Sequence, residues 1–102
     1  MATEGVNMKY NTFELRRQSD DLVYVFKRGS KGFQRQDNLE MWITYRGSEI
    51  GWVAFDDTGI YGLTGRPWDT PPKDQSPDHP PEGIWVSRKN ERSYVYDLVY
   101  LE

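Results

Sequence analysis

The chain has no cysteine, one histidine and no long run of apolar residues. Without cysteine there is no disulfide, no thiolate nucleophile and no cysteine-ligated zinc. A membrane-spanning helix needs about 20 consecutive apolar residues, and no segment approaches that length. The start, MATEGVNMKYN, lacks the apolar core of a secretory signal. We therefore expect a protein of the cytoplasm.

Hydrophobic residues are also scarce, at 36% of 102 residues, whereas aromatic residues reach 15%. Each aromatic side chain buries far more surface than an alanine or a valine. We expect one core filled by a few large rings, because two cores in so short a chain would each be too small. Residues 1–9 lack periodicity and are expected to be a flexible terminus, followed by a single domain over residues 10–102.

Apolar and polar residues alternate with period two along much of the chain, which predicts β-strands. Residues 39–63 read as a meander of three strands joined by two tight turns. At the first turn, Gly47-Ser48 fits a two-residue hairpin loop, which sets Tyr45 opposite Ile50. The second turn is expected at residues 56–59.

The same alternation predicts strands outside the meander, over residues 10–17, 22–28, 33–36, 83–89 and 92–102. A helix over residues 34–40 is an alternative to the third of these, although Asp37 and Asn38 are poor residues for a helix interior. No segment has a convincing 3.6-residue period. The chain is therefore predicted to be all-β, with six or seven antiparallel strands in a small barrel or a two-sheet sandwich.

All six prolines lie in one stretch, GRPWDTPPKDQSPDHPPEG, over residues 65–83. Proline lacks a backbone N–H and fixes φ, so neither a helix nor an interior strand is expected there. The stretch is predicted to be one long, stiff loop. Loops longer than about 12 to 15 residues are uncommon in compact domains and tend to be functional.

The proline-rich loop is the predicted partner-binding surface, with Arg66, Trp68, Asp69 and His79 as its candidate residues. Its Pro-Pro pairs are already extended, so a partner can hold them at little entropic cost. The alternative is that Trp68 folds back as a lid over one end of the barrel. We expect an accessory subunit, adaptor or inhibitor that binds another protein and is itself a monomer or weak homodimer.

Charge is distributed unevenly along the chain. Residues 37–83 carry nine Asp or Glu against three Lys or Arg, within a net charge of −3 for the whole chain. This acidic stretch is expected to steer the protein towards a basic surface on its partner.

Binding of single-stranded nucleic acid is the competing interpretation. The cations Lys27, Arg28, Lys31 and Arg35 interleave with aromatic residues, and this combination is typical of a groove on which bases stack. Against it, the net charge is negative, whereas phosphate binding needs a concentrated basic face. The alternative for these residues is structural: the aromatic rings point into the core, and the cations lie in solvent at a hairpin tip.

The composition bears on two further classes of function. Four tryptophans and seven tyrosines offer flat surfaces for a carbohydrate or other small ligand, although most of these rings are needed to fill the core. Catalysis is not expected, because a general base must be held rigidly and His79 stands in a loop. Asp78, His79 and Glu82 fall short of a preorganised metal site. We expect a non-enzyme without cofactor or metal.

Overall fold

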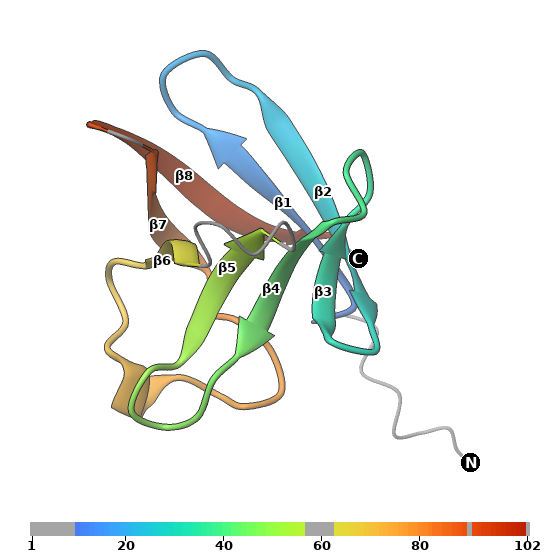
Figure 1. Ribbon diagram of the computed structural model, residues 1–102, viewed down its shortest axis with the longest axis vertical. Helices are drawn as coiled ribbons and strands as arrows, with labels where there is room; N and C mark the ends of the chain where they lie inside the picture. The colour runs from blue at the N-terminus through green and yellow to red at the C-terminus, as the bar shows by residue number, and fades with distance from the viewer. Residues whose placement is uncertain (1–9, 57–62, 90, 102) are drawn as a thin grey trace.

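The computed structural model describes residues 10–56, 63–89 and 91–101 (Figure 1). These residues form eight strands: β1 (Thr12–Arg17), β2 (Val23–Gly29), β3 (Gly32–Arg35), β4 (Met41–Tyr45), β5 (Trp52–Asp56), β6 (Leu63–Pro67), β7 (Gly83–Lys89) and β8 (Arg92–Leu101). Each strand pairs antiparallel with the next, and β8 pairs with β1, which closes a barrel. The predicted all-β class is confirmed, and of the two predicted architectures the barrel is observed.

Aromatic rings fill the barrel. Along β1, Phe13 and Leu15 are buried while Glu14 and Arg16 face outward, as the alternation predicts. The core cluster consists of Phe13, Leu15, Phe26, Phe33, Ile43, Trp52, Trp85, Tyr96 and Leu98. Most of these residues are aromatic, and an eight-stranded barrel is just wide enough for such side chains to fill.

The hairpin between β4 and β5 differs from the predicted two-residue turn. Tyr45 lies opposite Trp52 rather than Ile50, so the register is shifted by two residues. Residues 46–51 form the loop, in which the Gly51 N–H donates to the Gly47 carbonyl over 2.7 Å. A shift of two residues leaves the same side chains on the core face, because side chains alternate with period two.

The proline-rich loop is shorter than predicted. Gly65, Arg66 and Pro67 belong to β6 and pair with β7, although no strand was expected there. Pro67 is the last residue of β6, and the next N–H, from Trp68, donates to the Ile84 carbonyl over 2.7 Å. A proline at the end of a strand interrupts the ladder least. The loop therefore covers residues 68–82 and contains the short 3-10 helix η2 (Pro72–Asp74).

Several sequence predictions fall outside the described residues. Residues 1–9 lie outside, as do most of the predicted turn at 56–59 and the first residues of the third predicted strand of the meander. The alternative helix over residues 34–40 is wrong, since β3 reaches Arg35 and irregular backbone follows. In the described part of the chain, no helix has the length and apolar character needed to cross a membrane.

Candidate protein-interaction site

Residues 68–82 cover one end of the barrel, at the end that also carries the β2–β3 and β4–β5 turns (Figure 1). Side chains from inside the barrel hold this loop. Trp52 Nε1 donates to the Ser76 carbonyl over 2.6 Å, and Trp85 Nε1 donates to the Pro81 carbonyl over 3.1 Å. Each buried indole thus directs its N–H at a loop carbonyl, as buried tryptophans require.

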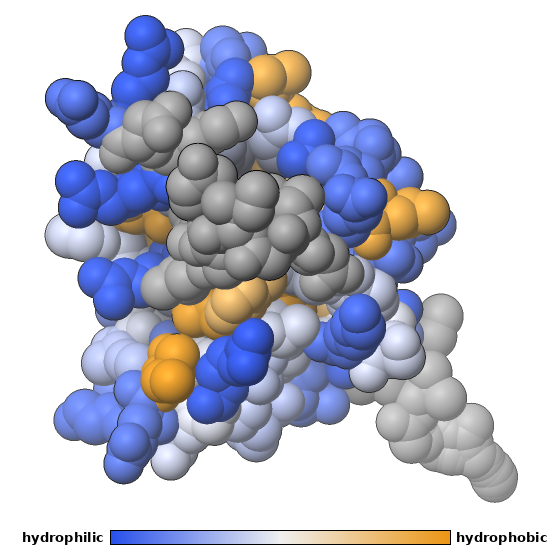
Figure 2. Space-filling model, viewed as in Figure 1, coloured by the Kyte–Doolittle hydropathy of each residue, from blue (hydrophilic) through white to orange (hydrophobic). Residues whose placement is uncertain are grey.

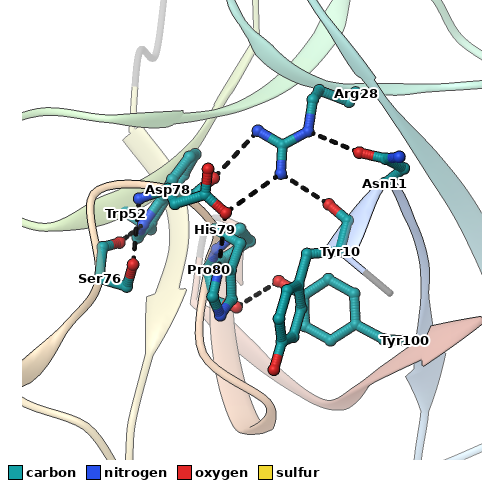
Figure 3. A network of polar contacts seen from close by, with 9 residues as sticks. All are labelled: Tyr10, Asn11, Arg28, Trp52, Ser76, Asp78, His79, Pro80 and Tyr100. Atoms are coloured by element: carbon teal, nitrogen blue, oxygen red, sulfur yellow. Dashed lines mark hydrogen bonds and ion pairs between the residues drawn. The ribbon is translucent and has the colours of Figure 1, made fainter. Parts of the chain in front are cut away.

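Tyr100 adds a third bond of this kind, because its hydroxyl donates to the Pro80 carbonyl (Figure 3). Burial raises the pKa of the Tyr100 hydroxyl far above its ordinary value, so the group stays protonated and remains a donor. Pro80 itself is among the most fully buried residues. It is the apolar anchor of the loop.

Gln75 is the polar anchor of the loop and is only 8% exposed. Its Oε1 accepts the backbone N–H of Trp52 over 2.7 Å, and its Nε2 donates to the Thr70 carbonyl over 2.8 Å. Both ends of the side-chain amide are therefore satisfied, as a buried glutamine needs. The loop is fixed to the start of β5 by this residue.

Trp68 does not fold back onto the barrel. Its side chain is 67% exposed, so the hypothesis that Trp68 is the lid is wrong. Pro80 and Gln75 take that place, because the Tyr100 hydroxyl donates to the Pro80 carbonyl and the Trp52 backbone N–H donates to Gln75 Oε1. The tryptophan is left at the surface on a loop that is otherwise tied down.

A groove of about 400 Å³ lies beside Trp68, between the loop and the β4–β5 hairpin. Ile50, Arg66, Trp68 and Pro71 line it, and Ile50 is 56% exposed. Elsewhere, the face shown in Figure 2 is mostly hydrophilic, with hydrophobic side chains in small separate groups. Two large apolar side chains thus flank one hollow, which is a typical feature of a protein-binding surface.

The four predicted partner-binding residues do not all lie at one site. Arg66 and Trp68 line the groove, whereas Asp69 and His79 do not. Asp69 Oδ2 accepts the Ile84 N–H over 3.3 Å and so fixes the start of the loop. His79 stacks on Tyr10, with 3.6 Å between ring centroids, and its Nδ1 lies 3.1 Å from the Asp78 carboxylate.

Arg28 joins this part of the loop to β2 and to the residues before β1 (Figure 3). Its Nε donates to Asn11 Oδ1 over 2.9 Å, its Nη1 to the Asp78 carbonyl over 3.0 Å and its Nη2 to the Tyr10 carbonyl over 2.8 Å. Nη2 also lies 3.5 Å from the Asp78 carboxylate. The fork of one guanidinium thus holds three backbone segments together.

The cations considered for nucleic-acid binding do not form one basic face. Arg28 is engaged as described, and Arg35 lies opposite the core residue Phe26 and pairs with the exposed Asp37. Lys31 Nζ lies 5.6 Å from the centroid of the Trp42 ring. Phe26 and Phe33, which would have to stack on bases, are buried in the core. Lys27 remains exposed on the outside of β2.

The geometry gives little support to sugar stacking or to metal binding. Trp42, Trp52 and Trp85 are buried, which leaves Trp68 as a lone exposed indole rather than part of a platform. Within residues 10–56, 63–89 and 91–101, no three His, Asp or Glu side chains gather closely enough to hold a metal ion.

Sequence reasoning missed three residues of this site. Ile50 was paired with Tyr45 in the incorrect register, although Gly47 and Gly51 on either side of it were a signal for a longer loop. Gln75 and Pro80 gave no signal. In a polar, proline-rich stretch, the sequence does not distinguish a glutamine or proline that will be buried from one that will be exposed.

Comparison with known proteins yields no match: no protein-family model fits the chain, and neither the curated proteins nor the solved structures contain a significantly similar protein. The functional interpretation therefore depends on the geometry of the described residues.

Proposed function

We propose that this protein is a non-catalytic interaction module that binds a segment of another protein in the groove between Ile50 and Trp68. The observation that carries the proposal is the exposed Trp68 side chain on a loop fixed by buried donors. A surface that is already ordered loses little conformational entropy on binding. Tryptophan is also among the residues that contribute most to binding energy at protein interfaces.

The groove favours a partner segment with an apolar anchor and basic neighbours. Ile50, Trp68 and Pro71 supply apolar contact area. Asp69 and Asp74 are exposed on the same loop, and the stretch around them is strongly acidic. Complementary charge of this kind speeds association and excludes wrong partners more than it adds affinity. An accessory subunit, an adaptor or an inhibitor would each fit this mode of binding.

The test compares three forms of the protein as baits in lysate of the source cells. Trp68→Ala removes the exposed indole, and Leu39→Ala removes a side chain of similar exposure, at 59%, from the β3–β4 connection at the other end of the barrel. Captured proteins are quantified by mass spectrometry, and the thermal midpoint of each bait is measured.

We expect a set of proteins to be captured equally by the wild type and Leu39→Ala, and at least about tenfold less by Trp68→Ala. A tenfold loss corresponds to about 1.4 kcal/mol of binding free energy. The thermal midpoints should stay close together, because neither side chain is buried. Equal capture by all three baits would refute the proposed site.

A further inference from the structure

The groove beside Trp68 carries two exposed side chains of opposite charge. Arg66 lines it from β6, and Glu49 lines it from the β4–β5 hairpin. Among the residues that the structure describes, neither of the two forms an ion pair or a side-chain hydrogen bond. One positive and one negative group are therefore available to whatever enters the groove.

Arg66 differs in this respect from four other arginines of the barrel. Each of those four forms an ion pair with a carboxylate of the chain: Arg16, Arg17, Arg28 and Arg35. The fork of a guanidinium matches a carboxylate in bidentate geometry. The Arg66 fork can therefore accept a carboxylate that a partner brings.

An apolar surface lies next to this cation. The Trp68 N–H bond to the Ile84 carbonyl continues the β6–β7 ladder, so Arg66 and Trp68, two residues apart, leave the same face. Val53, which is only 3% exposed, also lines the groove, as does the exposed Ile50. A ligand in the groove thus meets a guanidinium beside an apolar surface.

The size of the groove limits what can fill it. A cavity of about 150 Å³ accepts benzene, which is roughly 25 Å³ for each carbon atom. By this measure, the groove of about 400 Å³ holds about 16 non-hydrogen atoms, close to the content of two amino-acid residues. The last residue of a chain is the shortest fragment that joins a carboxylate to an apolar side chain, because both are attached to one Cα. An internal acidic residue would need a second residue for the apolar contact.

We propose that the groove binds the carboxyl terminus of a partner protein. The terminal carboxylate is bound by Arg66, the apolar side chain of the last residue lies between Ile50 and Trp68, and a basic residue just before it faces Glu49. Capture of a terminal carboxylate is a recurring mode of peptide recognition. Opposite charges at the two sides of the groove fix the direction of the bound segment. This inference rests on the proposed function, since it names the part of the partner that enters the same groove.

The probe is a pool of acetylated hexapeptides GSGKKX with a free carboxyl end, in which X is leucine, isoleucine, valine or phenylalanine. It is added to the ¹⁵N-labelled full chain, and binding is followed by NMR through the indole N–H signal of Trp68. A second pool has an amidated end. In a third pool, X is followed by an amidated glutamate, which moves the carboxylate to a side chain.

We expect the free-acid pool to give a saturable shift and to bind at least tenfold more tightly than either of the other pools. Arg66→Gln should abolish this preference, so that the free-acid and amidated pools bind equally. Arg88→Gln is the matched control, because Arg88 is exposed on the neighbouring β7 but does not line the groove. In Arg88→Gln the preference for the free acid should remain.

Glu49→Gln tests the other charge. It should weaken binding of the free-acid pool, but not of a pool in which glutamine replaces both lysines. Equal weakening of the two pools would overturn the proposed contact between Glu49 and a basic residue.

The results separate this inference from the proposed function. If the free-acid and amidated pools bind equally and Trp68→Ala weakens both, the inference is overturned while the proposed function stands. Equally tight binding of the glutamate pool, or an unchanged preference in Arg66→Gln, would also overturn it. If the free-acid pool gives no saturable shift, the inference fails, and lysate capture by Trp68→Ala still decides the proposed function.

Discussion

The backbone N–H of Trp52, the first residue of β5, donates to the side-chain Oε1 of Gln75 over 2.7 Å. The bond joins the barrel wall to the middle of the proline-rich loop, 23 residues further along the chain. Gln75 holds Thr70 with its other end, so one side chain fixes both the loop and the floor of the groove. The exposed Trp68 is presented by a loop that is ordered before any partner arrives.

Replacing Gln75 should therefore destabilise the protein. In Gln75→Ala the buried N–H of Trp52 loses its acceptor, and an unsatisfied buried donor costs about 1 to 3 kcal/mol. Chemical denaturation should show a loss of unfolding free energy in that range. Gln36→Ala is the control, since Gln36 is exposed and its Nε2 bonds the nearby Gln34 carbonyl. A similar loss in both variants would mean that the Trp52–Gln75 bond has no special role.

Two glycines of the β4–β5 loop provide a matched comparison. Gly47 and Gly51 both have positive φ, of 97° and 76°. A Cβ on Gly47 would meet nothing within 4 Å, whereas one on Gly51 would overlap the side-chain amide of Gln75. Both alanine variants should lose stability from backbone strain, on the order of 1 kcal/mol. Gly51→Ala should lose clearly more, because the amide must also move.

The measurement for this pair is the denaturation midpoint of each variant, alone and combined with Gln75→Ala. The excess cost of Gly51→Ala should shrink when Gln75 is absent, since the overlapping group is then gone. If Gly47→Ala and Gly51→Ala cost the same in both backgrounds, the close approach of Gly51 to Gln75 does not limit this position.

The alternation of apolar and polar residues predicted which side chains share a face of a strand. It did not predict which residues lie opposite each other on neighbouring strands. In β8 it puts Tyr96 and Leu98 on one face, and both side chains are buried, but apolar residues on both faces left the core side undecided. It could not distinguish Tyr45 opposite Ile50 from Tyr45 opposite Trp52, because a two-residue shift preserves every face. The correct pairing depends on the loop geometry set by Gly47 and Gly51.

The candidate site was predictable only in part. Arg66 and Trp68 were identified from residue type, and both line the groove. Which loop residue would be buried was not visible from the sequence. That choice follows from where the Trp52 backbone N–H and the Tyr100 hydroxyl meet the loop, and this depends on the closed barrel rather than on the loop's own composition.

The guanidinium of Arg28 should not be replaceable by an ammonium group. Arg28→Lys keeps the charge, but one nitrogen cannot serve the three acceptors that Asn11, Tyr10 and Asp78 present. We expect a loss of about 1 to 3 kcal/mol in unfolding free energy. Lys27→Gln, on the outside of the same strand, should change stability by less than about 0.5 kcal/mol. Full stability in Arg28→Lys would show that charge alone suffices at this position.

Protonation of the Asp37 carboxylate should lower the stability of the folded protein in acid. Its bond with Arg35 lowers the pKa of the Asp37 carboxyl below the ordinary 3.8, so the folded state favours the ionised form. This stabilisation is fully present above the unfolded pKa and is lost as pH falls through the lower folded pKa. Unfolding free energy measured from pH 6 down to pH 2 should therefore decrease less steeply below about pH 4 in Asp37→Asn than in the wild type. Parallel curves for the wild type and Asp37→Asn would show that the Asp37–Arg35 pair contributes nothing to acid sensitivity.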